Sequence, residues 1–202
     1  PTVGASPQFN IPEDPFILIT AGGGGDGEGL MEWVLRAYEY DPDLPYPAVL
    51  VLGPFMSQEK QAEFLDRANR LDRVQAMTFD ARIETLMSKA AGMVSMGGYN
   101  TFCEILSFDK RALIIPRTEP RLEQYIRAKR AEELGLISML VDNGDHDPKE
   151  MAKSLRKLPG QPRPSEILPT DILGGLPQVN RLAKRWLRKS RDLRNIPVRQ
   201  RA

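Results

Sequence analysis

The feature that most constrains the fold is a regular alternation of short apolar runs with longer stretches at helical spacing. Six short runs are mostly apolar and are punctuated by glycine or proline, and we expect strands at 16–20, 48–52, 74–77, 92–96, 112–115 and 137–141. Helices are expected at 30–40, 58–68, 83–90, 101–108, 122–134 and 148–158. Strands that are apolar on both faces and alternate with helices are typical of parallel sheets. The pattern predicts an α/β fold with a doubly wound, Rossmann-like parallel sheet of about six strands.

Proline and glycine divide the chain into four segments. We expect a leader at 1–15, the sheet domain at 16–158, an irregular linker rich in proline and glycine at 159–177, and a basic helix with its tail at 178–202. Asp147 followed by Pro148 predicts a helix start, because an acidic N-cap and a proline at the first helical position both favour one. The chain opens on Pro1 rather than on methionine, which is consistent with a piece of a longer protein.

Composition excludes several classes of protein. No run reaches the roughly 18 to 20 consecutive apolar residues of a membrane-spanning helix, and the start of the chain lacks the regions of a signal peptide. We therefore expect a cytoplasmic protein. Cys103 and His146 are the only residues of their kinds, so neither an internal disulfide nor a Cys/His zinc cluster can form. His146 lies in a polar turn and is expected at the surface.

A glycine-rich loop follows the first expected strand and contains Gly22, Gly23, Gly24 and Gly25. Glycine lets backbone amides approach a phosphate closely, and the helix that follows offers free N–H groups and a partial positive charge. A flexible turn explains the same residues equally well. The loop is neither a P-loop nor a clean G-x-G-x-x-G motif, so an ATPase is not indicated.

A second glycine turn follows the fourth expected strand and is more specific. It combines two glycines, polar residues at a helix start and a carboxylate one helical turn later: Gly97, Gly98, Tyr99, Asn100, Thr101 and Glu104. Asn100 and Thr101 could donate to a phosphate, and Glu104 could accept hydrogen bonds from ribose hydroxyls. Alternatively, Thr101 is a simple N-cap and Glu104 a solvated acid.

The stretch 98–124 resembles the donor-binding signature of glycosyltransferases with two Rossmann-like domains, the GT-B architecture. It is most similar to the MurG-type N-acetylglucosaminyltransferases and to the UDP-glycosyltransferases. The matching residues are Gly98, Tyr99, Asn100, Thr101, Glu104, the strand at 112–115, Pro116, Glu123 and Gln124. The chain departs from the family at Met96, where the plant enzymes have histidine, and at 109–111, where the family tends to have glycine.

The resemblance implies a role for each matching residue. Gly98, Asn100 and Thr101 would hold the diphosphate, Glu104 the ribose, and the Glu123–Gln124 pair the transferred sugar. Phe79 would lie against uracil or thymine, although a core phenylalanine is an equally good interpretation. The first glycine loop would line the cleft near the donor phosphates.

The resemblance also implies an activity, the transfer of a hexosyl or N-acetylhexosaminyl group from a UDP-sugar to an unknown acceptor. Transfer would invert the anomeric carbon and need no metal or other cofactor, the UDP-sugar being the co-substrate. The catalytic base would come from an N-terminal acceptor-binding domain that this chain lacks. The alternatives are an enzyme similar to UDP-N-acetylglucosamine 2-epimerase and a non-catalytic nucleotide-binding module.

The last segment is basic and amphipathic. Apolar residues recur at helical spacing, with arginine and lysine filling most of the remaining positions. We expect this helix to pack against the N-terminal half of the same protein, as terminal helices do in GT-B proteins. The alternative is a peripheral contact with the inner face of a membrane. Nucleic acid is not an expected partner, because the body of the domain is acidic.

Overall fold

The computed structural model describes residues 12–22, 25–78, 83–168 and 174–194, with the side chains of the last range described as far as residue 188. Three residues predicted to contact the donor, Gly23, Gly24 and Phe79, lie outside this part of the chain.

Six strands form one parallel sheet in the order β3-β2-β1-β4-β5-β6. The strands are β1 Ile17–Thr20, β2 Ala48–Val51, β3 Val74–Met77, β4 Gly92–Ser95, β5 Ala112–Ile114 and β6 Ser138–Met139. The predicted α/β class and the doubly wound sheet are thereby confirmed. Strand order reverses between β1 and β4, and in sheets of this kind ligands bind in the crevice outside the strand ends at that point.

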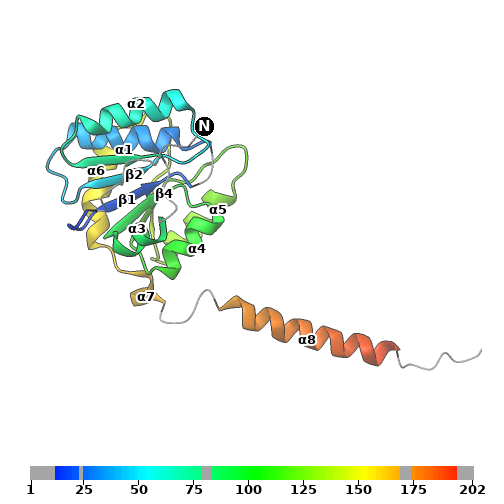
Figure 1. The fold of residues 1–202 in the computed structure, drawn as a ribbon. Coiled ribbons are helices and arrows are strands. Elements are labelled where there is room, and N and C mark those ends of the chain that lie inside the picture. Colours follow the sequence, from blue (N-terminus) through cyan, green and yellow to red (C-terminus); the bar gives the residue numbers. More distant parts are fainter. Residues whose placement is uncertain (1–11, 23–24, 79–82, 169–173, 195–202) are drawn as a thin grey trace, which may run out of the picture. The chain divides into compact units, whose positions relative to one another are not determined.

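Helices cover both faces of the sheet (Figure 1). They are α1 Glu28–Tyr40, α2 Gln58–Asn69, α3 Ile83–Lys89, α4 Tyr99–Ser107, α5 Glu123–Glu133 and α6 Pro148–Lys157. Helix α1 packs against α2 and α6 on one face, while α3, α4 and α5 lie on the other (Figure 1). Each helix predicted in the sheet domain is present, and no end differs from the expected one by more than two residues.

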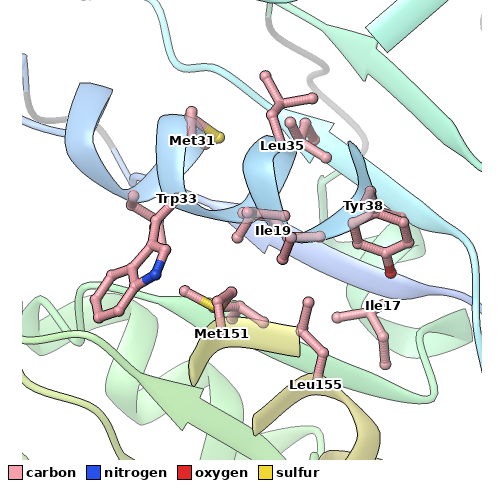
Figure 2. Packing of buried hydrophobic residues seen from close by; sticks show 14 of the residues in the cluster. Ile17, Ile19, Met31, Trp33, Leu35, Tyr38, Met151 and Leu155 are labelled. Atoms are coloured by element: carbon pink, nitrogen blue, oxygen red, sulfur yellow. The ribbon is translucent and has the colours of Figure 1, made fainter. Parts of the chain in front are cut away.

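Strand β1 is buried between the helices on the two faces of the sheet. All four residues of β1 are buried, and Ile17 and Ile19 lie beneath side chains from α1 and α6, including Trp33 and Met151 (Figure 2). The indole Nε1 of Trp33 donates to the carbonyl of Asp147 at 2.7 Å, which ties α1 to the start of α6. Each large apolar side chain buried in this way stabilises the fold by about 1.5–3 kcal/mol. The carboxyl end of β1 is therefore a fixed platform for the residues that follow.

The first part of the predicted linker, residues 159–168, contains regular structure that was not predicted. A 3₁₀ turn at Leu158–Gly160 is followed by the short helix α7 Pro164–Ile167, which begins on a proline as helices often do. Ser165 donates from its backbone N–H and from its hydroxyl to Asp109, both at 2.8 Å. These bonds attach α7 to the sheet domain, and the first of the chain's two compact units extends to Ile167 rather than ending at 158.

The second unit contains the single long helix α8 Gly175–Arg194. It begins three residues before the predicted start, and it places the apolar residues Val179, Leu182 and Trp186 along one side. Among the described helices, none has a stretch that is both long and apolar enough to cross a bilayer. What α8 packs against stays a prediction.

Candidate functional site

The same turn is built twice, side by side, where β1 and β4 end. Thr20 and Ser95 are partners in the ladder between these strands. The hydroxyl of Thr20 accepts from the N–H of Gly22 at 3.1 Å, and the hydroxyl of Ser95 accepts from the N–H of Gly97 at 3.2 Å. The two glycines have nearly equal positive φ values, +72° and +70°. The strand reversal point therefore carries a matched pair of turns.

Gly97 is needed for space as well as for conformation. A Cβ at this position would lie 2.7 Å from Cγ2 of Ile114 on the neighbouring strand β5, closer than real contacts allow. Positive φ is in addition rare for residues with a side chain. Both reasons restrict the position to glycine.

The helices that begin after these turns have no side-chain caps. The N-cap residues of α1 and α4 are Gly27 and Gly98, and neither has a side chain that could accept a hydrogen bond. By contrast, Ser57 accepts from a backbone N–H at the start of α2, and Asp147 does the same at the start of α6. The first-turn N–H groups of α1 and α4 thus lack this compensation, and a helix start in that state attracts anions.

A cavity of about 240 Å³ lies over this point. It is lined by both glycine turns, by the start of α4 and by Asp26, Arg117 and Gln124. Gly97, Gly98, Tyr99, Asn100 and Thr101, which were predicted to contact the donor, all belong to its wall. Gly22 lines the cavity as well, whereas Gly25 does not and lies instead against the carbonyl of Phe55.

A second cavity, of about 280 Å³, adjoins the first and contains Glu104. The two share Thr20, Gly22, Asn100 and Thr101. The remaining wall comes from the residues that follow β2 and from Ile83 and Met87 of α3. Glu104 and Gly22 therefore line the same cavity, whose wall also includes apolar side chains.

The loop after β5 contributes a cation that sequence reasoning missed. The guanidinium of Arg117 donates to Asp26 at 2.6 Å and lies 3.3 Å from the carboxylate of Glu123. The hydrogen bond to Asp26 raises the pKa of Arg117 above its usual value. Sequence offers little signal for such a residue, because an arginine in a loop belongs to no periodic pattern.

The predicted Glu123–Gln124 pair divides between two roles. Gln124 lines the 240 Å³ cavity, and its side-chain oxygen accepts from the backbone N–H of Arg117 at 3.1 Å. Glu123 lines none of the cavities described here and contacts Arg117 instead.

Arg127 supports the second glycine turn from α5 and was also not predicted. It donates to the carbonyl of Gly97 at 2.8 Å, and its guanidinium lies 5.6 Å from the ring centre of Tyr99. Tyr99 itself is 69% exposed. The arginine therefore fixes the turn while the tyrosine ring remains open to a ligand.

The expectation that His146 lies at the surface is wrong. Its side chain is only 18% exposed, and its ring lies 5.5 Å from that of Trp33. Nε2 is 2.9 Å from a carboxylate oxygen of Asp142. A left-handed backbone conformation at His146 turns the side chain back onto α1, which a polar sequence context does not reveal.

A third cavity, of about 530 Å³, continues from the first past Asp26 and Arg117. Its walls include the loop after β5 together with Asp142 and Gly144. Within the ranges that the structure describes, no group of three or more His, Cys, Asp or Glu residues could hold a metal ion.

Solved structures of similar fold are glycosyltransferases. The calicheamicin glycosyltransferase CalG4 matches with a TM-score of 0.58 at 18% identity over 78% of this chain and 36% of its own. The glycosyltransferase VinC in complex with dTDP matches with a TM-score of 0.55 at 24% identity, over 74% of this chain and 34% of its own. MurG of Acinetobacter baumannii matches with a TM-score of 0.52 at 17% identity, over 75% of this chain and 47% of its own. This chain thus spans between about a third and a half of their lengths.

No curated protein matches the chain at a significant level. The sequence does match a family model, the glycosyltransferase family 28 C-terminal domain, over residues 17–165. That match covers the whole parallel sheet and both glycine turns. With the fold and the paired turns agreeing, the chain belongs to the family of glycosyltransferase family 28 C-terminal domains.

Proposed function

We propose that this domain binds the nucleotide part of a UDP-sugar and is the donor half of a glycosyltransferase. The observation that carries the proposal is the pair of glycine turns at the strand reversal point, where the uncapped start of α4 lines both the 240 Å³ cavity and the cavity that contains Glu104. Backbone N–H groups are suited to phosphate oxygens, and a carboxylate is suited to the two hydroxyls of a ribose.

The two cavities divide the donor between them. The diphosphate occupies the 240 Å³ cavity, against the N–H groups that follow Gly98 at the start of α4. The nucleoside occupies the 280 Å³ cavity, with its ribose at Glu104 and its base near the apolar side chains of α3. Asn100 and Thr101 line both, and so stand where the ribose joins the phosphates.

The sugar then extends toward Gln124 and the loop after β5. During transfer, the bond between the anomeric carbon and the diphosphate breaks while an acceptor oxygen attacks from the opposite face, which inverts the carbon. The leaving diphosphate gains negative charge, which the start of α4 stabilises without a metal ion. The acceptor's proton passes to a base on an N-terminal domain, so this chain binds the donor but does not turn it over.

Calorimetric titration of the 202-residue chain with UDP tests the proposal. We expect saturable binding that Glu104→Ala weakens about tenfold or more, because hydrogen bonds to a charged group contribute about 1.5–3 kcal/mol. Titration with dTDP in parallel establishes whether the base site distinguishes uracil from thymine.

The matched control is Glu59→Ala, which removes an exposed carboxylate from α2, outside all the cavities described above. It should leave the UDP affinity unchanged. Absence of heat at millimolar UDP, or equal losses for the two variants, would count against a donor site at Glu104.

A further inference from the structure

An ion pair joins the two loops that border the diphosphate cavity. Asp26 follows β1 and Arg117 follows β5, and their side chains meet at 2.6 Å although they are 91 residues apart in the sequence. Both residues line the 240 Å³ cavity and also the 530 Å³ cavity beside it. The pair therefore stands on the boundary between the proposed diphosphate site and the space beyond it.

These two residues are the only charged ones among the described residues that line the 240 Å³ cavity. In the structure Arg117 pairs with Asp26 at 2.6 Å, and a second carboxylate, that of Glu123, lies 3.3 Å from its guanidinium without lining the cavity. A diphosphate carries at least two negative charges near neutral pH, so it is repelled by Asp26 and attracted by Arg117. Because the cation is already engaged, an incoming diphosphate has to compete with Asp26 for it.

Arg117 is placed to change partners without moving its backbone. Its N–H is held by Gln124, while its side chain remains 32% exposed at the cavity mouth. Nε is buried and has no hydrogen-bond partner in the part of the chain that the structure describes. A guanidinium has five N–H donors in a planar fork that suits phosphate oxygens, and the fork here is only partly used.

We propose that Arg117 is a diphosphate-binding residue and that Asp26 is its competitor, which the diphosphate displaces when the donor enters. The inference rests on the proposed function, and it adds a reason why the site would select a nucleoside diphosphate over a nucleoside. A nucleoside without phosphates gains nothing from Arg117, whereas a nucleoside diphosphate gains a charge-assisted contact that it must take from Asp26.

The experiment measures binding of UDP, inorganic pyrophosphate and uridine to variants of the 202-residue chain. Arg117→Met should lower the affinity for UDP and for pyrophosphate about tenfold or more, while the affinity for uridine should change by no more than about twofold. Asp26→Asn should strengthen UDP and pyrophosphate about threefold or more, because it removes the competing carboxylate. Arg121→Met is the matched control: it removes an exposed arginine from the same loop and should change none of the three affinities.

Two results would overturn the proposal. In one, Arg117→Met leaves UDP and pyrophosphate binding unchanged. In the other, Asp26→Asn weakens UDP binding as Arg117→Met does. That result would mean that the intact ion pair supports binding and that Asp26 does not compete with the diphosphate. The Asp26→Asn result stands even if Arg117→Met fails to fold. Failure of the proposed function looks different, because then the unaltered chain binds neither UDP nor uridine.

Discussion

At the scale of single residues, the site depends on backbone more than on side chains. The hydroxyls of Thr20 and Ser95 shape the two turns by accepting from the N–H groups of Gly22 and Gly97. The N–H groups left for a ligand are those at the uncapped start of α4, which follows Gly98. The described side chains with ligand chemistry are few, chiefly Glu104, Arg117 and Gln124. Such a site tolerates change poorly at its glycines.

Gly97→Ala should lower the free energy of unfolding by about 2–4 kcal/mol, because a left-handed conformation costs a residue with a side chain about 1–2 kcal/mol and the clash with Ile114 adds to it. Gly144→Ala is the matched control, since its φ is +86° but an added Cβ would meet nothing within 4 Å. Urea denaturation of both variants separates the two costs. Equal losses would mean that the contact with Ile114 is relieved at no cost.

At the scale of elements, the sequence predicted the parts that obey a period. Buried strands such as β1 and β2 stand out as apolar runs, whereas β6 is only two residues long and was expected to be longer. Helix α7 was not predicted, because its four residues are too few to show a period and their order depends on Asp109. The Asp26–Arg117 pair was missed for a related reason: only the folded sheet brings the two loops together.

Helix starts with a side-chain cap and helix starts without one should respond differently to substitution. Gly98→Asp should weaken UDP binding about tenfold or more without loss of stability, because a side-chain cap would occupy the N–H groups that the phosphates need. The backbone at Gly98, with φ −52° and ψ 154°, resembles that of the capping Ser57, at −59° and 145°, and an added Cβ has open space.

Ser57→Ala is the complementary variant, because it removes an existing side-chain cap at the start of α2. It should cost about 1 kcal/mol of stability through loss of the cap and leave UDP affinity unchanged. Thermal denaturation and calorimetry of the two variants check both statements. If Gly98→Asp bound UDP as tightly as the unaltered chain, the start of α4 would not be the phosphate site.

At the scale of the whole molecule, the sheet order explains why one edge carries the site. The reversal between β1 and β4 leaves their carboxyl ends uncovered by a crossover, and both glycine turns follow strands that end there. The chain spans between about a third and a half of the solved glycosyltransferases it matches. Under the function proposed above, the acceptor and the catalytic base belong to another part of the protein.

The most direct test of the central claim is a map of backbone amide chemical shifts during titration of the 202-residue chain with UDP. The claim is that a nucleoside diphosphate binds between the two glycine turns. The largest changes should therefore fall on the N–H groups of Gly98, Asn100 and Thr101, with little change at the capped helix starts near Ser57 and Asp147. Changes centred elsewhere, or none at saturating UDP, would contradict it.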